Sequence, residues 1–232
     1  LGGFAINGAL EKSGIDASAV DYVIMGQVLQ AGTGQVTARQ AACSAGIPMS
    51  TPAITINKVC LSGLNAIYLA AQMINAGDAE VVVAGGMENL SQAPHVLRGM
   101  RDTYKLARPP RSGTELEKDM EDYLFTNLLD GFCGSFMAQT SDDICKRKGV
   151  TREETDEFAA LSHNRTSKSV KNGIWQSELV EVNGIGFEDE DHVVPGCTKE
   201  SLSELRTAFG PDSLVTAGNA SGVVDGAAAV VV

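Results

Sequence analysis

The sequence predicts an α/β fold, a sheet with helices packed on its faces, and three observations support this prediction. Over residues 1–93, short segments of strand character alternate with segments of helical periodicity, the pattern of a layered α/β domain. The unbroken valine run at 81–83 is typical of a strand that is buried on both faces. Residues 227–232 return to strand character after a long and more polar stretch. We therefore expect these two strands to share one sheet, with residues 94–214 inserted between them.

The elements of the first 93 residues follow from the spacing of apolar residues. Phe4, Ile6 and Leu10 fall at helical spacing, which predicts a helix that ends near Ser13. After it we expect, in order, a strand at 20–27, an alanine-rich helix at 34–45, a strand at 53–57, a helix from 60 to 77 and a strand at 80–84. Gly77 stands where the C-terminus of a helix favours glycine.

The predicted insertion combines charged surface segments with helices. Residues 98–122 are rich in charge and contain Pro109-Pro110, which is typical of an excursion over the surface. Thr151 followed by Glu154 has the spacing of a capping box and predicts a helix that continues to about Gly173. The remaining predicted elements are a helix at 140–148, an acidic loop at 187–192 and a short helix at 202–208.

The composition is that of a soluble globular protein. Of the 232 residues, 44% are hydrophobic and 20% are charged, and a chain of this length forms one large or two ordinary domains. The formal net charge of −11 argues against a basic nucleic-acid-binding face, so we expect no nucleic-acid partner. We find no run of about 18 apolar residues and expect no segment that spans a membrane.

The cysteines and histidines show no spacing typical of a metal site, and we expect no bound metal. An odd and scattered set of cysteines indicates reduced thiols in a reducing compartment. These residues are Cys43, Cys60, Cys133, Cys145 and Cys197. The histidines, which we interpret as surface residues, are His95, His163 and His192.

Cys60 is the most informative residue because it lies between the predicted strand at 53–57 and the helix that follows. The N-terminus of a helix presents unpaired N–H groups and the positive end of the macrodipole, which both favour an anion. Such a position favours the thiolate, which is the nucleophilic form of cysteine. The alternative interpretation is a small cysteine packed in the core.

The sequence contains two long motifs. One surrounds Cys60, and the other leads into the C-terminal strand. The first begins with Asn57-Lys58-Val59-Cys60-Leu61-Ser62-Gly63 and continues to Ala84-Gly85-Gly86-Met87-Glu88-Asn89. The second is Val215-Thr216-Ala217-Gly218-Asn219-Ala220-Ser221-Gly222-Val223-Val224-Asp225-Gly226-Ala227. Both resemble the thiolase family and occur in the order that the family has, and weaker similarity extends over essentially all 232 residues.

The resemblance implies a thiolase-like layered αβαβα fold, built from two similar halves, of which this chain carries the N-terminal half. Residues 1–93 and 215–232 would form an incomplete N-terminal α/β domain, and residues 94–214 would be the loop domain that covers coenzyme A. We expect the C-terminal thiolase domain to be absent. The chain begins and ends within predicted elements, so we expect a fragment of a longer protein.

The resemblance assigns Cys60 as the catalytic nucleophile that is acylated, with its own backbone N–H as one oxyanion donor. The family's other catalytic groups lie in Asn-Glu-Ala-Phe, Gly-His-Pro and Cys-x-Gly-Gly-Gly segments, and the sequence contains none of these. We therefore expect the missing histidine and second cysteine beyond Val232, and the 232 residues alone to be inactive. The other cysteines match no catalytic position of the family and are interpreted as structural.

The resemblance also implies residues that contact the substrate coenzyme A. Ser221 matches the serine that hydrogen-bonds the pantetheine, and Met137 matches the methionine beside the acyl pocket. The other matching positions are Ala217 and Gly218 in the turn of Ser221, Ala208 and Phe209 near adenine and pantetheine, and the apolar contact Leu128. For Leu128 and Phe209, plain core packing is the alternative. Phe136 replaces the histidine of acetoacetyl-specific members, which leaves the acyl-chain specificity open.

These matches are compatible with more than one function. The first hypothesis is an acetyl-CoA C-acetyltransferase, which joins two acetyl-CoA molecules or cleaves a 3-ketoacyl-CoA through a cysteine thioester. The alternatives are a degradative 3-ketoacyl-CoA thiolase of fatty-acid β-oxidation and a non-catalytic acyl-CoA- or lipid-binding module. We expect no cofactor other than coenzyme A or acyl-CoA as substrate, and a homodimer or homotetramer. The expected location is the cytoplasm, or the mitochondrial matrix or peroxisome in a eukaryote.

Overall fold

The computed structural model describes residues 1–98, 120–183 and 192–232, which belong to two compact units. Unit 1 contains residues 1–127 and 224–232, and unit 2 contains residues 128–223. Unit 2 coincides with most of the segment that the sequence predicts as an insertion. The predicted charged excursion lies largely at 99–119, and the predicted acidic loop at 187–191, so both predictions fall outside the described residues.

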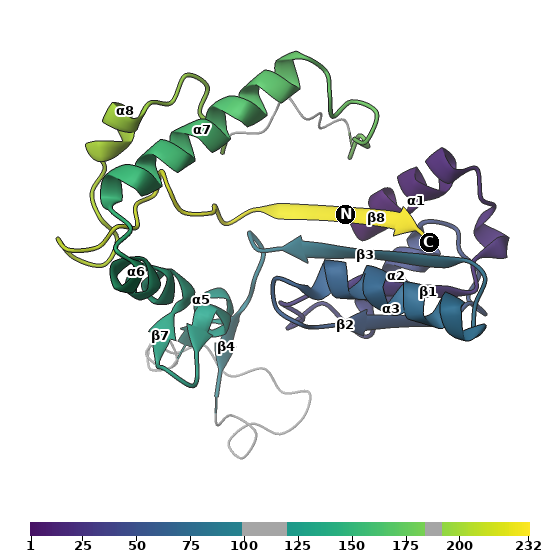
Figure 1. Ribbon diagram of the computed structural model, residues 1–232. Coiled ribbons are helices and arrows are strands. Elements are labelled where there is room, and N and C mark those ends of the chain that lie inside the picture. Colours follow the sequence, from purple (N-terminus) through teal and green to yellow (C-terminus); the bar gives the residue numbers. More distant parts are fainter. Residues whose placement is uncertain (99–119, 184–191) are drawn as a thin grey trace. The chain divides into compact units, whose positions relative to one another are not determined.

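Unit 1 is built on a mixed sheet with the strand order β2-β1-β3-β8 (Figure 1). Its strands are β1 (Tyr22–Gly26), β2 (Ala53–Ile56), β3 (Val82–Asn89) and β8 (Asp225–Val231). β1 runs parallel to β2 and to β3, whereas β8 pairs antiparallel with β3 from Val83↔Val231 to Asn89↔Asp225. The prediction that the valine-rich strand and the C-terminal strand share one sheet is therefore confirmed.

Helices cover both faces of this sheet, as the alternation of side chains requires. Val23, Met25 and Val83 point to one face, where they form a core with α1 (Gly2–Ser13) and α2 (Thr37–Ser44). Ile24, Val82 and Ala84 point to the other face and pack against Ala66 and Ala70 of α3 (Ser62–Ala76). A short 3₁₀ helix (Ala17–Ala19) leads from α1 into β1. The α/β layering predicted from the sequence is thus confirmed.

α3 exposes part of its apolar surface. Its small residues Ala66 and Ala70 pack on the sheet, while Leu64 and Tyr68 are 64% and 60% exposed. By length and composition alone, residues 59–76 could cross a membrane, with 17% of that window buried. This finding corrects the expectation from the sequence that no segment has the length and composition of a membrane span. The segment qualifies because it contains no charged residue. A helix of this composition also suits one layer of a soluble α/β fold.

α2 begins at Thr37, later than its predicted start at 34. Val36 precedes it in the left-handed conformation at φ 39° and provides no side-chain cap. The Thr55 hydroxyl of the neighbouring strand β2 accepts the N–H of Ala38 at 2.9 Å instead. A tertiary contact therefore caps this helix, and the local sequence gives no signal for it.

Asp225 fastens the beginning of β8 to the loop that follows β3. Its carboxylate accepts the Ser91 N–H at 2.9 Å and the Ser91 hydroxyl at 2.5 Å. Burial raises the pKa of Asp225, but these hydrogen bonds lower it more, so the net pKa lies below the ordinary value of 3.8. The carboxylate is therefore ionised at neutral pH and remains an acceptor.

Three short elements complete the described part of unit 1 and lead into unit 2. Strands β4 (His95–Leu97) and β5 (Met120–Asp122) pair antiparallel, and α5 (Tyr123–Leu128) follows them. In unit 2, β6 (Leu129–Asp130) and β7 (Ser135–Phe136) form a small hairpin.

Unit 2 is mainly helical. It contains α6 (Met137–Lys148), α7 (Arg152–Lys171) and α8 (Lys199–Ser203), with a small core of Ala159, Ala160, Cys197 and Leu202. The predicted capping box is confirmed, because Thr151 caps the N–H of Glu154 and the Glu154 carboxylate accepts the N–H of Thr151.

The predicted helix at 202–208 is wrong. α8 ends at Ser203, and the Ala208 N–H bonds to Val215 O at 2.8 Å in an extended segment. The reason is Arg152, whose guanidinium donates to the Leu202 and Leu205 carbonyls at 2.7 and 3.2 Å. The Leu205 carbonyl thus binds a side chain from α7 where a continued helix would have used its own N–H group, whereas the Leu202 carbonyl also accepts the Leu205 N–H at 3.0 Å.

We predict that Gly85→Ala destabilises unit 1. A β-carbon at Gly85 would collide with the backbone carbonyl of Ala228, so β3 and β8 would have to separate. Overpacking of this kind costs about 1–3 kcal/mol. Urea unfolding monitored by circular dichroism measures the change.

Gly226→Ala is the matched control, because a β-carbon there meets no atom within 4 Å and the residue lies in the paired strand. Equal unfolding midpoints for Gly85→Ala and Gly226→Ala would contradict the predicted collision.

Candidate active site

Cys60 lies in a tight loop that joins β2 to α3, two residues before the helix begins, and it is exposed. The Asn57 side chain accepts the N–H of Val59 at 2.9 Å. The Ser62 hydroxyl accepts the N–H of Lys58 at 2.8 Å and donates to Val59 O at 2.6 Å. The chain therefore turns sharply immediately before Cys60, and side chains on both sides fix the turn.

Val59 has the left-handed conformation, with φ at 50°. This conformation is unfavourable for a β-branched residue, with a cost of order 1–3 kcal/mol, and it persists only where the surroundings enforce it. Here Asn57 and Ser62 enforce it. Strain directly beside a cysteine at a helix start supports a functional role for Cys60 and argues against the alternative of core packing, which its exposure also excludes.

A cavity of about 390 Å³ opens at Cys60, at the carboxyl ends of β1 and β3. Ligands of α/β sheets bind characteristically at this edge. Small residues form much of the wall, among them Gly26, Gly63 and Gly86. A β-carbon at Gly26 would lie 2.6 Å from the Ser62 β-carbon. Glycine at this position therefore allows the start of α3, and Cys60 with it, to approach the sheet.

Glu88 fixes the position of the segment after β1, which forms another wall of the same cavity. Its carboxylate accepts the N–H groups of Val28 and Leu29 at 2.8 and 3.0 Å, in the segment that follows β1. Val28 and Glu88 both line the cavity with Cys60. The sequence analysis did not predict this contact. The one feature that could have indicated it is a carboxylate, Glu88, at the end of a glycine-containing strand.

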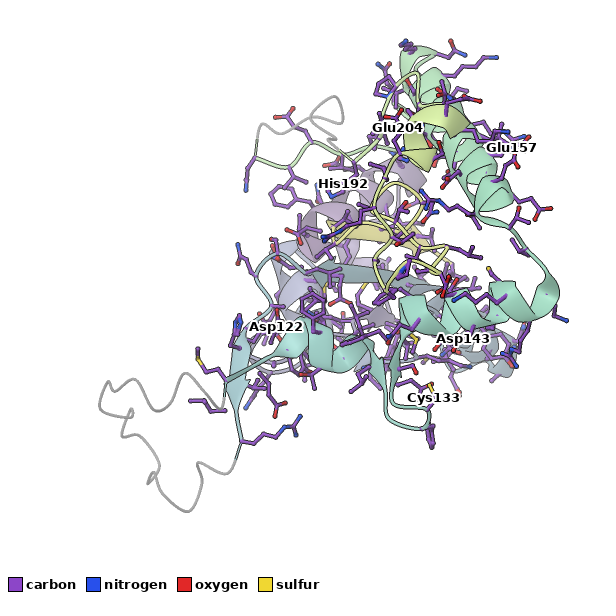
Figure 2. All side chains as sticks on the ribbon, turned by 90° about the vertical axis from the view of Figure 1, so that its left-hand side faces the viewer. Asp122, Cys133, Asp143, Glu157, His192 and Glu204 are labelled. Carbon is purple, nitrogen blue, oxygen red and sulfur yellow. The ribbon has the colours of Figure 1, made fainter. Side chains whose placement is uncertain are left out.

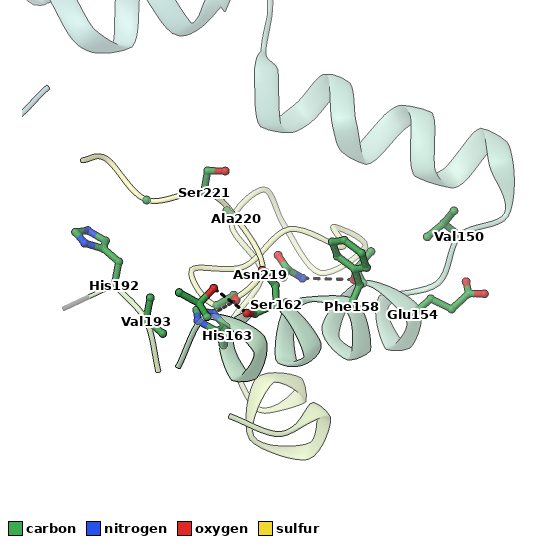
Figure 3. A pocket seen from close by; sticks show the side chains of 15 residues that line it. Val150, Glu154, Phe158, Ser162, His163, His192, Val193, Asn219, Ala220 and Ser221 are labelled. Carbon is green, nitrogen blue, oxygen red and sulfur yellow. Dashed lines mark hydrogen bonds between the residues drawn. The ribbon is translucent and has the colours of Figure 1, made fainter. Parts of the chain in front are cut away.

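The second group of predicted residues lies in unit 2. Ser221 and Gly218 line a cavity of about 560 Å³ together with α7 side chains such as Phe158 and His163 (Figure 3). A β-carbon at Gly218 would lie 2.5 Å from the side-chain ends of both Leu202 and Leu205, so these two side chains would have to move. Ser221 and Ala217 are exposed.

The other predicted coenzyme A contacts lie elsewhere on unit 2. Leu128 and Phe209 are 37% and 40% exposed, so plain core packing does not explain them. Met137 begins α6 and is also exposed, as is Ala208. The cavity that contains Ser221 includes none of these four among its wall residues in the described part of the chain.

His163 is not a simple surface residue. Its Nδ1 accepts the N–H of Val194 at 3.3 Å, and its Nε2 lies 3.3 Å from the Gly218 carbonyl oxygen. Because Val194 N–H can only donate, Nδ1 is unprotonated and Nε2–H donates to Gly218 O. His163 therefore ties α7 to two loops, which corrects the interpretation from the sequence.

Asp142 of α6 holds the start of the turn that carries Gly218 and Ser221. Its carboxylate accepts the N–H of Leu214 at 2.7 Å and pairs with Lys146 at 3.1 Å. Burial raises the pKa of Asp142, but the Leu214 N–H and Lys146 lower it more, and the net pKa lies below 3.8. The stabilising effect of the ionised carboxylate is therefore present above about pH 4 and is lost as the pH falls through the lowered pKa.

All five cysteines are free thiols in environments that differ. Cys197 is buried in the core of unit 2, Cys43 and Cys145 are half-buried, and Cys133 is exposed on the turn between β6 and β7 (Figure 2). Over the described ranges, no cluster of three or more His, Cys, Asp or Glu side chains could hold a metal ion.

The family model of the thiolase N-terminal domain matches residues 1–232. The chain belongs to the thiolase family. The acetyl-CoA acetyltransferase of Cupriavidus necator is 46% identical over 239 residues, and that of Pseudomonas aeruginosa is 43% identical over 237. The alignments cover 100% and 99% of this chain but 59% and 58% of the relatives. This thiolase chain thus spans somewhat more than half the length of these relatives.

Solved thiolase structures share the fold. Human mitochondrial 3-ketoacyl-CoA thiolase in complex with CoA superimposes with a TM-score of 0.87 at 37% identity, over 99% of this chain and 57% of that one. The Bacillus anthracis acetyl-CoA acetyltransferase gives a TM-score of 0.84 at 33% identity, over 98% and 57%. The predicted thiolase-like α/β fold is therefore confirmed.

We predict that iodoacetamide labels Cys60 several-fold faster than Cys133. Both thiols are exposed, but Cys60 precedes the N-terminus of α3, whose unpaired N–H groups stabilise the negative charge on the attacking sulfur. Time-resolved labelling followed by peptide mass spectrometry gives both rates in one sample. Faster labelling of Cys133, or of the half-buried Cys43 or Cys145, would contradict the assignment of Cys60.

Proposed function

We propose that the protein is a thiolase of the acetyl-CoA C-acetyltransferase type, with Cys60 as the residue that carries the acyl group. The observation that carries this proposal is an exposed cysteine, held by a strained turn at the start of α3, inside a cavity at the carboxyl edge of the sheet. The names of the relatives support the same activity. A binding module needs no thiol positioned in this way, which disfavours the non-catalytic alternative.

In the proposed synthetic direction, the Cys60 sulfur forms a bond to the acetyl carbon of acetyl-CoA. The bond from that carbon to the CoA sulfur breaks, and CoA leaves as a thiolate that takes up a proton. The product is again a thioester, so the exchange is nearly balanced in free energy. The backbone N–H of Cys60 is proposed as one donor to the oxyanion, and such donors lower the barrier by a few kcal/mol.

In the cleavage direction, Cys60 attacks the 3-keto carbon and the bond between carbons 2 and 3 breaks. Acetyl-CoA leaves after carbon 2 takes up a proton, and CoA then removes the shortened acyl group from Cys60. We propose that the proton-transferring histidine and the second cysteine come from the family segments that these 232 residues do not contain.

Coenzyme A and its thioesters are the proposed substrates, without a separate cofactor. Ser221 is the proposed hydrogen-bonding contact to the pantetheine, because its turn is rich in glycine and it borders a cavity. Ala217 and Gly218 would line the same turn. The exposed apolar residues Leu128, Met137 and Phe209, with Ala208, are the other proposed contacts. The proposed location remains the cytoplasm.

A degradative 3-ketoacyl-CoA thiolase is the second candidate. Phe136 occupies the position where acetoacetyl-specific members of the family carry histidine, and it lies in β7 directly before Met137. A longer acyl chain would favour an apolar side chain at this place. A comparison of acetoacetyl-CoA with longer 3-ketoacyl-CoA substrates separates the two candidates.

We predict that Cys60→Ser abolishes thiolysis of acetoacetyl-CoA in the complete natural polypeptide that carries residues 1–232. Loss of a nucleophile costs about 10³-fold or more in kcat. Cys133→Ser is the control and should retain activity. The 232 residues alone should be inactive, since a missing general base costs about 10²–10⁴-fold. Thiolysis by Cys60→Ser at the parental rate would rule out the proposed function.

We propose further that the protein forms a homodimer or homotetramer through β2 and α3. β2 is an edge strand of the described sheet, and its Ile54 is exposed, as are Leu64 and Tyr68 of α3. An exposed apolar edge favours association with another chain. Sedimentation velocity should give an oligomer for the complete polypeptide and a lower mass for Ile54→Lys. A monomeric parent, or an unchanged mass for the variant, would contradict this arrangement.

A further inference from the structure

Asp156 of α7 is a buried charged residue that the proposed chemistry does not use. It is 0% exposed, and its carboxylate accepts Arg152 Nε at 2.7 Å and Asn219 Nδ2 at 3.0 Å. Burying a charge is expensive unless it is paired and hydrogen-bonded. Because Arg152 and Asp156 are neighbours on one helix, their ion pair connects no separate elements. Of the two contacts of Asp156, the one to Asn219, 63 positions away, connects α7 to another part of unit 2.

Asn219 closes the turn at 214–219 from inside. Its Nδ2 donates to Leu214 O at 2.8 Å, and its Oδ1 accepts the N–H of Thr216 at 2.7 Å. One amide side chain thus binds both ends of the turn and the helix beneath it. Ser221 follows two residues later and is exposed beside the cavity (Figure 3).

Asp156 is one of three groups that set the direction of the Asn219 amide. An ionised carboxylate is only an acceptor, so it requires the NH₂ group of Asn219 to face it. The Leu214 carbonyl is also only an acceptor and requires the same NH₂ group to face it. The Oδ1 atom of Asn219 is then free to accept the N–H of Thr216. Every donor in this set meets an acceptor, and the described part of the chain has no buried side-chain polar atom without a partner.

Two further contacts hold the same turn. His163, seven residues after Asp156 on α7, approaches Gly218 O, and Asp142 of α6 accepts the N–H of Leu214. Arg152 in turn binds the carbonyls of Leu202 and Leu205, two residues whose side chains lie close to Gly218. The turn is thus held from two helices, from α6 through Asp142 and from α7 through Asp156 and His163.

We propose that Asp156 is a positioning residue for substrate binding: through Asn219 it holds the turn in the conformation that presents Ser221 to coenzyme A. This inference rests on the proposed function. It assigns to the buried Asp156 and its partners Arg152 and Asn219 an effect on the affinity for coenzyme A, beyond their contribution to stability.

The test compares Asn219→Asp, Asp156→Asn and the double variant in the complete polypeptide. Asn219→Asp places two carboxylates against each other, and its Kd and KM for coenzyme A should rise about tenfold or more, which corresponds to about 1.4 kcal/mol. In the double variant the new amide at 156 can donate to the new carboxylate at 219, so part of the affinity should return. Titration calorimetry with coenzyme A and thiolysis kinetics give the two constants.

Glu157→Gln is the matched control, because Glu157 is the exposed neighbour of Asp156 on α7 (Figure 2). It should leave Kd and KM unchanged. The rate of Cys60 alkylation should also stay at the parental value in each variant, because the change is confined to unit 2. If Asn219→Asp does not fold, Asn219→Ala removes the amide without adding a charge and carries the same comparison.

The outcomes separate the inference from the function on which it rests. An active parent whose Asn219 variants keep the parental Kd would overturn the inference and leave the proposed function intact. Alkylation of the buried Cys197 in the Asn219 variants would indicate general unfolding and would also overturn it. A parent that neither binds coenzyme A nor catalyses thiolysis would overturn both proposals.

Discussion

The close approach of α3 to the sheet governs the arrangement of unit 1. Register places Gly26 of β1 directly beside Gly86 of β3, and Gly63 of α3 packs against Gly86. A β-carbon at Gly26 would meet Ser62 and the N–H of Gly63 below 3 Å. Because these glycines have no side chains, the first turn of α3 packs close to the sheet. The strained turn at Val59 and the exposure of Cys60 at the edge of the sheet both depend on this close packing.

Periodicity and turn chemistry predicted the fold of unit 1 and the position of Cys60. Helix α1 and the strands β1, β2 and β3 correspond to patterns that neighbouring residues determine on their own, and the apolar character of β3 and β8 predicted that they share a sheet. The capping box of α7 is equally local, since Thr151 and Glu154 satisfy each other. The resemblance to the thiolase family added the residues of the Ser221 turn, which periodicity alone could not single out.

The features that the sequence did not predict depend on contacts between distant residues. α8 ends early because Arg152 binds carbonyls 50 and 53 positions away. Glu88 clamps a loop about 60 positions earlier in the chain. His163 was interpreted as a surface residue because nothing around it in the sequence indicates the Val194 and Gly218 backbone groups. In each case one polar side chain meets backbone groups that only the folded chain brings near.

The pairing of β8 with β3 has a consequence for how the protein is made. Asp225 and Ser91 are 134 positions apart, and all of unit 2 lies between the two strands. During synthesis the edge of β3 therefore remains unpaired until the whole intervening segment and β8 have been synthesised. Contacts of such long sequence separation slow folding and leave a strand edge available to wrong partners. The sheet that carries Cys60 is thus completed only after unit 2 has been synthesised, and a chaperone that covers the open edge of β3 until then would prevent wrong pairing.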